Sequence, residues 1–155
     1  MHRRERIPLI IQTLGRLAAG DADFAVFEDM TFPENYVQIA DVRPGSIPYV
    51  EVTCRSWPGD RLPPLSAEQI DALAALGFGR ELDPNHSGWF DWPDPACLAR
   101  LIESAFMILG AAPDFDLHVA RTGKWSTPKQ EPATPITVHP DPCPSVHPPP
   151  PHPHP

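Results

Sequence analysis

The order of hydrophobic patterns in the sequence predicts an α+β fold, in which an antiparallel sheet of four to five strands packs on about three helices. Two observations support this class. Three short segments with apolar patterns typical of strands follow one another, separated by turn sequences. Helical patterns surround them in the order helix, three strands, helix, one or two strands, helix, which fits neither an all-helical fold nor an all-parallel sheet.

The first helix is predicted over residues 6–19. Its apolar residues recur at the spacing of one helical face: Ile7, Ile10, Ile11, Leu14, Leu17 and Ala18. Gly20 follows, and glycine favours the left-handed conformation in which many helices end. The basic start before I-P-L-I-I resembles a signal peptide, but Gln12, Thr13 and Arg16 interrupt the apolar stretch, which favours an amphipathic helix.

Three strands are predicted next, over residues 23–29, 35–41 and 48–54. The first, D-F-A-V-F-E-D, is a short apolar run, and the other two, N-Y-V-Q-I-A-D and P-Y-V-E-V-T-C, alternate. Their connections contain Pro33 or the sequence R-P-G-S, which are typical of turns. Because the loops are short, we expect an antiparallel meander.

The second helix has the clearest local signature. Ser66 and Gln69 have the spacing of a capping box, and Leu65 and Ile70 that of the hydrophobic staple around it. The helix is predicted to continue to Gly77, where a left-handed residue would end it.

One or two strands and a last helix are predicted to complete the domain. Residues 78–82 and W-F-D-W at 89–92 are the candidate strands. Asp94 is expected to cap the helix, with Pro95 in its first turn. The apolar face of this helix consists of Leu98, Leu101, Ile102, Ala105, Phe106 and Leu109. A short final piece is predicted at Leu117–Ala120.

Composition divides the chain into a domain over residues 1–121 and a tail over residues 122–155. The tail holds 12 of the 23 prolines and 4 of the 7 histidines, and its few charges cancel. Prolines remove backbone donors and few apolar residues remain to bury, so the tail is expected to be disordered and partly polyproline II. The domain carries the whole formal charge of −8 and is long enough to bury a core.

The acidic balance disfavours nucleic acid and anionic membranes as partners, since both reward clustered Lys and Arg. No apolar run approaches the roughly 18 residues of a membrane span. The three cysteines share no metal or redox spacing and their odd number suits a reducing compartment, so a cytoplasmic protein is expected. Cys54 and Cys97 are expected to be small buried residues.

No cluster of residues is typical of an active site, so we expect neither enzymatic activity nor a cofactor. Asp94 is better explained as a helix cap than as a general acid, and His86 is expected in a solvated turn. The G-F-G sequence at 77–79 follows a helix instead of opening one, unlike a dinucleotide site. The tail histidines (His147, His152 and His154) would bind a metal only weakly, so no metal site is predicted.

Strand alternation separates the large aromatic side chains from the apolar faces. Tyr36, Tyr49 and Trp89 are expected on the opposite face of their strands, with Glu51 and Asp91 beside the last two. Such a face presents area with polar handles. Three interpretations remain open: these residues shield a half-exposed sheet, form a dimer interface, or bind a peptide or partner.

Three other aromatic residues are assigned in the same way or left open. Phe90 and Trp92 alternate with Trp89 and Asp91, and are expected to join the core. Trp57, in S-W-P-G-D, follows the third strand and fits any of the three interpretations.

The succession F-A-V-F-E, Y-V-Q-I-A, Y-V-E-V-T-C, L-S-A-E-Q with L-G-F, and G-W-F-D-W-P before a last helix resembles the actinobacterial TY-Chap domains. These are related to type III secretion chaperones and to the YbjN family, and the resemblance covers about residues 7–112. It implies an α+β fold with a curved antiparallel sheet and no catalytic centre, and binding of peptides or partly unfolded proteins. The acidic charge agrees with type III secretion chaperones, which are usually homodimers. The tail lies outside the resemblance.

The sequence therefore predicts a non-enzymatic, chaperone-like protein that binds an extended peptide or a partner protein. The expected contacts are Tyr36, Tyr49, Glu51, Trp89 and Asp91. One alternative is an interaction or scaffold protein that acts through P-P-P-P in its tail, docked in an aromatic groove of a partner. Another is metal handling by the tail histidines.

Overall fold

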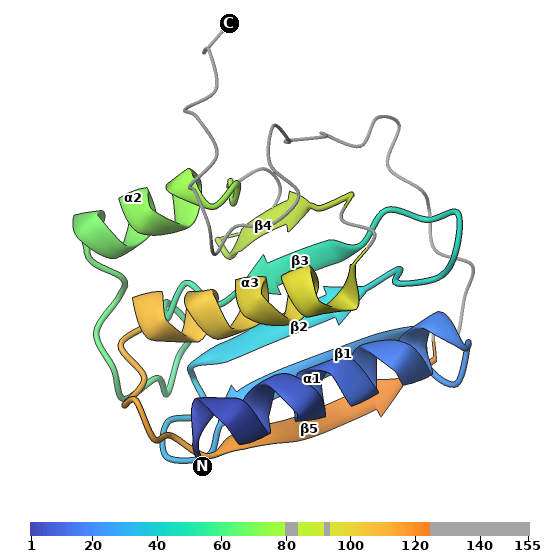
Figure 1. The fold of residues 1–155 in the computed structure, drawn as a ribbon. Helices are drawn as coiled ribbons and strands as arrows, with labels where there is room; N and C mark the ends of the chain where they lie inside the picture. The colour runs from blue at the N-terminus through green and yellow to red at the C-terminus, as the bar shows by residue number, and fades with distance from the viewer. Residues whose placement is uncertain (80–83, 92–93, 125–155) are drawn as a thin grey trace, which may run out of the picture.

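The computed structural model describes residues 1–79, 84–91 and 94–124. These residues form three helices and one five-stranded antiparallel sheet, which confirms the predicted α+β class (Figure 1). The helices are α1 (Arg3–Ala18), α2 (Ala67–Ala75) and α3 (Pro95–Ile108). The strands are β1 (Phe24–Asp29), β2 (Tyr36–Ala40), β3 (Tyr49–Val52), β4 (His86–Trp89) and β5 (Leu117–Gly123).

The sheet has the strand order β4-β3-β2-β1-β5. Strands β1, β2 and β3 form the predicted meander, β4 adds to β3, and β5 returns to pair with β1. The short final piece predicted at Leu117–Ala120 is therefore an edge strand, and it is longer than expected. Since Thr122 and Gly123 pair with Ala25 and Phe24, β5 continues past the domain boundary predicted at residue 121.

Helices α1 and α3 lie side by side over one face of the sheet, and α2 packs against α3 (Figure 1). The apolar stripes predicted for α1 and α3 point into the core beneath them, except that Ala18, at the end of the first stripe, is exposed. From the sheet, the core receives Ala25, Phe27, Val37, Ile39, Val50 and Val52. Phe90 joins it as predicted, with no exposed surface, whereas Trp92 lies outside the described residues.

The local signals that predicted the helix ends have the expected geometry. The Ser66 hydroxyl accepts from the Gln69 backbone N–H at 3.2 Å, and the Ser66 N–H donates to the Gln69 side chain at 2.9 Å. The Asp94 carboxylate accepts from the Ala96 N–H at 2.9 Å. Gly77 has a φ of 105°, a conformation that costs glycine little and other residues more.

Helix α1 begins at Arg3, three residues before the predicted start. The His2 N–H donates to the Glu5 carboxylate at 2.7 Å, which satisfies a backbone donor at the new start. The apolar stripe begins only at Ile7, so the polar first turn carries no helical periodicity. Pro8 lies inside the helix.

Strand β4 corrects the strand that was predicted over residues 89–92. The paired residues are His86–Trp89, because Trp89 lies opposite Tyr49 and His86 opposite Val52. The Phe90 N–H still donates to the Pro48 carbonyl at 2.9 Å, but Phe90 and Asp91 belong to no strand. The expectation of a solvated turn at His86 is also wrong, since His86 is only 3% exposed.

The outer edge of β4 is partly paired. Gly79 and Ser87 form an isolated antiparallel bridge in which each N–H donates to the other's carbonyl at 2.7 Å. The rest of the strand predicted over residues 78–82 lies outside the described residues, as does the tail from residue 125. Cys54 and Cys97 are buried as expected.

Candidate functional site

The candidate site is the sheet face turned away from α1 and α3, here called the reverse face. Direct cross-strand partners place Trp89 opposite Tyr49, Tyr49 opposite Ala40, Ala40 opposite Phe24, and Phe24 opposite Gly123. Partners in register share a sheet face. These five residues therefore form one row across the whole sheet, the aromatic row.

A second row lies beside the first and is more polar. It contains Ser87, Glu51, Gln38, Val26 and Arg121, which are again direct partners from β4 to β5. The reverse face therefore combines large rings with hydrogen-bonding side chains, as the alternation along the strands predicts.

Packing within the aromatic row is close at both ends. The Trp89 and Tyr49 ring centroids are 4.9 Å apart, with the planes tilted by 51°, a favourable arrangement for two rings. At the other end Phe24 lies over Gly123, where an added Cβ would be 2.9 Å from the ring. The Arg121 guanidinium lies 5.6 Å from the same ring.

The reverse face has an apolar layer separate from the helix-side core. Ala40 and Val26 are only 1% and 7% exposed, yet neither belongs to the core cluster beneath the helices. Ala40 lies in register between Tyr49 and Phe24, whose larger side chains flank it. The large rings of this face are half-buried.

Asn85 connects the polar side chains of the reverse face. Its amide nitrogen donates to the Tyr36 hydroxyl at 2.9 Å and to the Glu51 carboxylate at 2.7 Å. Its amide oxygen accepts from the Cys54 N–H at 3.0 Å. The Tyr49 hydroxyl donates to the other Glu51 oxygen at 3.0 Å. Tyr36, Asn85, Glu51 and Tyr49 thus form one chain of hydrogen bonds, the Asn85 network.

Tyr36 connects this network to the loop after β3. Burial raises the pKa of the Tyr36 hydroxyl above its usual value, a rise that hydrogen bonds from the Asn85 and Trp57 side chains oppose and the Glu51 charge reinforces. Trp57, which the sequence left unassigned, therefore lies at the Tyr36 end of the network, and it is 45% exposed.

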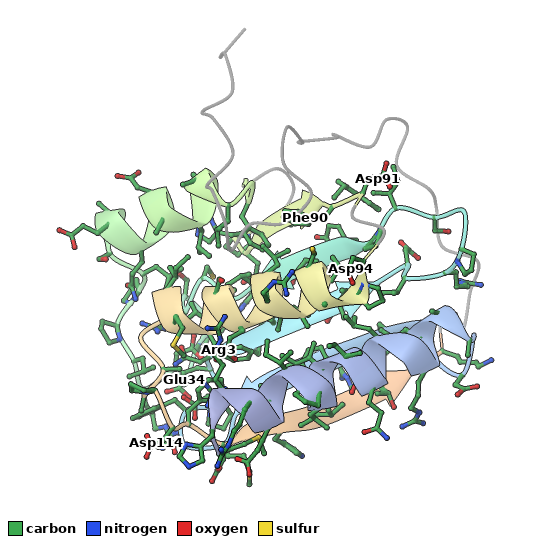
Figure 2. All side chains as sticks on the ribbon, viewed as in Figure 1. Arg3, Glu34, Phe90, Asp91, Asp94 and Asp114 are labelled. Atoms are coloured by element: carbon green, nitrogen blue, oxygen red, sulfur yellow. The ribbon has the colours of Figure 1, made fainter. Side chains whose placement is uncertain are left out.

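Four of the five predicted contact residues come together on this surface. Tyr36, Tyr49 and Glu51 belong to the Asn85 network, and Trp89 packs on Tyr49. Asp91 does not join the rows. It is exposed and lies beyond the end of β4, on the segment that leads to Asp94 and α3 (Figure 2).

Sequence patterns did not identify Asn85 or Phe24 as part of this surface. Asn85 lies in D-P-N-H-S-G, a composition typical of turns, and nothing local distinguishes a buried bridging amide from a solvated one. Asn85 is in fact 3% exposed. The run D-F-A-V-F-E-D contains two phenylalanines, and its composition does not show which of them faces the core. With Phe27 facing the core, strand alternation assigns Phe24 to the reverse face.

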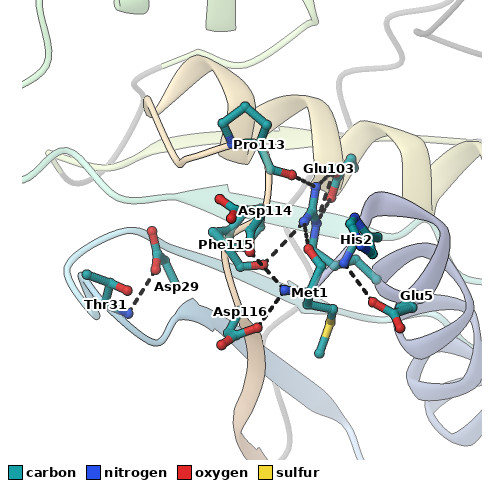
Figure 3. A network of polar contacts seen from close by, with 11 residues as sticks. Met1, His2, Glu5, Asp29, Thr31, Glu103, Pro113, Asp114, Phe115 and Asp116 are labelled. Carbon is teal, nitrogen blue, oxygen red and sulfur yellow. Dashed lines mark hydrogen bonds and ion pairs between the residues drawn. The ribbon is translucent and has the colours of Figure 1, made fainter.

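The basic N-terminus contributes less surface charge than its sequence indicates. The Arg6 side chain is 1% exposed and forms a buried ion pair with Glu103 (Figure 3). Its guanidinium also donates to the carbonyls of Met1, Pro113 and Phe115 and stacks 4.2 Å from the Phe115 ring centroid. Arg6 therefore has a structural role in joining α1 to α3.

In residues 1–79, 84–91 and 94–124, no three His, Cys, Asp or Glu side chains gather as a metal-binding group. Within the same ranges, no helix combines the length and the apolar character needed to cross a bilayer. The tail histidines lie outside these ranges.

Scans of family models, curated proteins and solved structures each find no match to this chain. The resemblance to TY-Chap domains therefore stays a prediction, and the reverse face is the part of the structure that bears on function.

Proposed function

We propose that this protein is a non-enzymatic, chaperone-like protein that binds an extended polypeptide on the reverse face of its sheet. The observation that supports this proposal most is the meeting of Tyr36, Tyr49, Glu51 and Trp89 on one face, where Asn85 joins Tyr36 to Glu51 and Tyr49 bonds to Glu51. Tyr and Trp give large contact areas at a low cost in side-chain entropy, and their polar tips accept or donate hydrogen bonds.

An extended peptide matches the chemistry of this surface. Its backbone carries an N–H and a C=O at nearly every residue, and each needs a partner when water is displaced. The aromatic row offers apolar area to the peptide's side chains, while the neighbouring row offers the Gln38 amide, the Ser87 hydroxyl and the Glu51 carboxylate to its polar groups. In an extended peptide, successive side chains point to opposite sides and backbone polar groups lie between them, so both rows can be contacted.

The proposal includes the relationship to TY-Chap and YbjN proteins and to type III secretion chaperones that the sequence suggests. It also includes a cytoplasmic location, which the buried cysteines Cys54 and Cys97 support, since cysteine thiols persist in reducing compartments.

The test is a titration of tryptophan fluorescence with pools of extended peptides. We expect a saturable change in the wild type. Tyr49→Ala should weaken the apparent affinity about tenfold or more, because tyrosine is enriched among the few interface residues that dominate binding, and a tenfold loss corresponds to about 1.4 kcal/mol. Met107→Ala is the matched control, since Met107 is an exposed apolar side chain on α3.

Two results would contradict the proposal. One is a wild-type protein whose fluorescence no peptide pool changes. The other is equal weakening by Tyr49→Ala and Met107→Ala, which would mean that binding does not depend on the reverse face.

A further inference from the structure

Glu51 is a half-buried carboxylate that receives hydrogen bonds from neutral groups. One oxygen accepts from the Asn85 amide at 2.7 Å, and the other accepts from the Tyr49 hydroxyl at 3.0 Å. A carboxylate offers about four acceptor positions, two on each oxygen. Glu51 therefore keeps one acceptor position on each oxygen after these contacts.

No positive charge compensates Glu51 within the described ranges. The ion pairs there join Arg6 with Glu103, Arg43 with Asp23, Arg61 with Glu34, His118 with Glu28, and the N-terminus with Asp116. Glu28 makes a useful comparison, because it lies on the same face and has His118 at 4.0 Å. Among the described residues, Glu51 thus has hydrogen-bond donors but no cation beside it.

The surroundings of Glu51 suit a cation with a flat, extended end. Tyr49 donates to Glu51, so its ring lies next to the carboxylate, and the Trp89 ring packs on the Tyr49 ring. Aromatic faces attract cations, and a guanidinium stacks on them more often than an ammonium does. The surplus of acidic residues in the domain attracts the same sign of charge over a longer range.

We propose that Glu51 is the docking point for an arginine side chain of the bound peptide. The two parallel N–H groups of a guanidinium match one remaining acceptor position on each carboxylate oxygen. The plane of the guanidinium then lies beside the Tyr49 ring, which is backed by Trp89. Lysine supplies the charge but not the paired donors, so it binds less well. This inference rests on the proposed function and names the side chain that the reverse face selects.

Three random peptide pools test the inference. The first contains arginine, the second has citrulline at every arginine position, and the third has lysine there. Citrulline keeps the length and planar end of arginine but carries no charge. We expect the wild type to bind the arginine pool about tenfold more tightly than the citrulline pool, since hydrogen bonds to charged groups are among the stronger ones. The lysine pool should lie between them.

Glu51→Gln tests the residue itself, because glutamine keeps the shape and removes the charge. The preference for arginine over citrulline should fall to about threefold or less, while binding of the citrulline pool stays within about twofold of the wild type. Glu28→Gln is the matched control and should keep the full preference, since it removes the same charge from the same face. Circular dichroism checks that both variants are folded.

The outcomes separate this inference from the proposed function. If the wild type binds all three pools equally, the arginine site is wrong and peptide binding stands. If no pool binds, the proposed function fails, and the arginine site with it. If Glu51→Gln keeps the arginine preference, or Glu28→Gln abolishes it equally, then Glu51 is not the docking point. The comparison of the three pools uses the wild type alone, so it tests for an arginine preference even if Glu51→Gln folds poorly.

Discussion

Asn85 is the residue on which the polar part of the reverse face depends most. Its amide joins the backbone of Cys54 to the side chains of Tyr36 and Glu51, so one side chain satisfies groups from three segments. Burial at 3% exposure keeps water from replacing these contacts. The orientation of the two predicted contact residues, Tyr36 and Glu51, is therefore set by a third residue.

Asn85→Ala should lower the free energy of unfolding by about 2 kcal/mol. It leaves the Cys54 N–H without its acceptor and Glu51 without one donor, and an unsatisfied buried group costs about 1–3 kcal/mol. Urea denaturation measures the change. Gln38→Thr, on the same face, should stay within about 0.5 kcal/mol. If Asn85→Ala also lowers the free energy of unfolding by less than about 0.5 kcal/mol, the network contributes little to stability.

Ionisation of Tyr36 gives a second prediction at this scale. Burial raises its pKa above the usual 10.0, so the folded protein keeps the hydroxyl proton at a pH where the unfolded chain releases it. Stability from this group is thus complete below about pH 10 and is lost as the pH rises through the higher pKa of the folded state. Tyr49→Phe leaves Tyr36 as the only tyrosine, and its tyrosinate absorbance should have a midpoint above pH 10. A midpoint at or below 10 would contradict this assignment.

Among the elements, β4 depends most on close packing. Gly88 pairs with Val50 on the helix-facing side, and a Cβ there would lie 2.7 Å from the Phe90 ring and 2.9 Å from the Gly77 carbonyl. Phe90 is fully buried and Gly77 offers a backbone atom, so neither can move away easily. Glycine at position 88 therefore allows β4 to lie this close to Gly77, just after the end of α2.

Gly88→Ala should therefore destabilise the protein by about 2 kcal/mol, within the range found for overpacked interiors. Gly79→Ala provides the control, because a Cβ at Gly79 meets nothing within 4 Å and the backbone there is not left-handed. We expect that variant to be neutral or slightly more stable. Thermal or urea unfolding compares the two, and equal effects would mean that the close approach at Gly88 does not matter.

At the scale of the whole molecule, the Arg6–Glu103 pair joins the two helices that cover the sheet. Arg6 also donates to the carbonyls of Pro113 and Phe115, on the segment that leads from α3 to β5. First helix, last helix and last strand are thus held at one buried point (Figure 3). Such a pair contributes mainly to where the elements sit, because the cost of removing both charges from water offsets much of their attraction.

Glu103→Leu should lower the free energy of unfolding by about 3–5 kcal/mol, since it leaves the Arg6 guanidinium buried without its carboxylate. That is a large part of the 5–15 kcal/mol typical of a domain. The double variant Arg6→Met with Glu103→Leu removes both charges and should recover part of the loss. Urea denaturation of both variants measures the difference, and a single variant that loses less than about 1 kcal/mol would contradict the structural role of the pair.

The elements that sequence predicted well are those whose signals are local. Ser66 with Gln69 predicts the start of α2, and Asp94 predicts the start of α3, because a cap and the amide that it satisfies are two or three residues apart. Alternation along β2 and β3 likewise separates Tyr36, Tyr49 and Glu51 from the core. Each of these predictions depends on geometry within a few residues.

The predictions that failed depend on residues far apart in the chain. The bounds of β4 follow from its register with β3, which a composition of W-F-D-W cannot show, and the same pairing buries His86. The bridging role of Asn85 requires Tyr36 and Glu51 from two other strands.

By itself, the sequence determined the α+β class, the order of its elements and the face of each central strand that carries a ring. The tertiary structure decided which of those rings become neighbours, which polar group connects them, and that Glu51 lies among them without a cation in the described part of the chain. The physical reason is range: side-chain periodicity and capping are set by the backbone within one turn or a few strand residues. Register and burial follow from pairing between segments tens of residues apart.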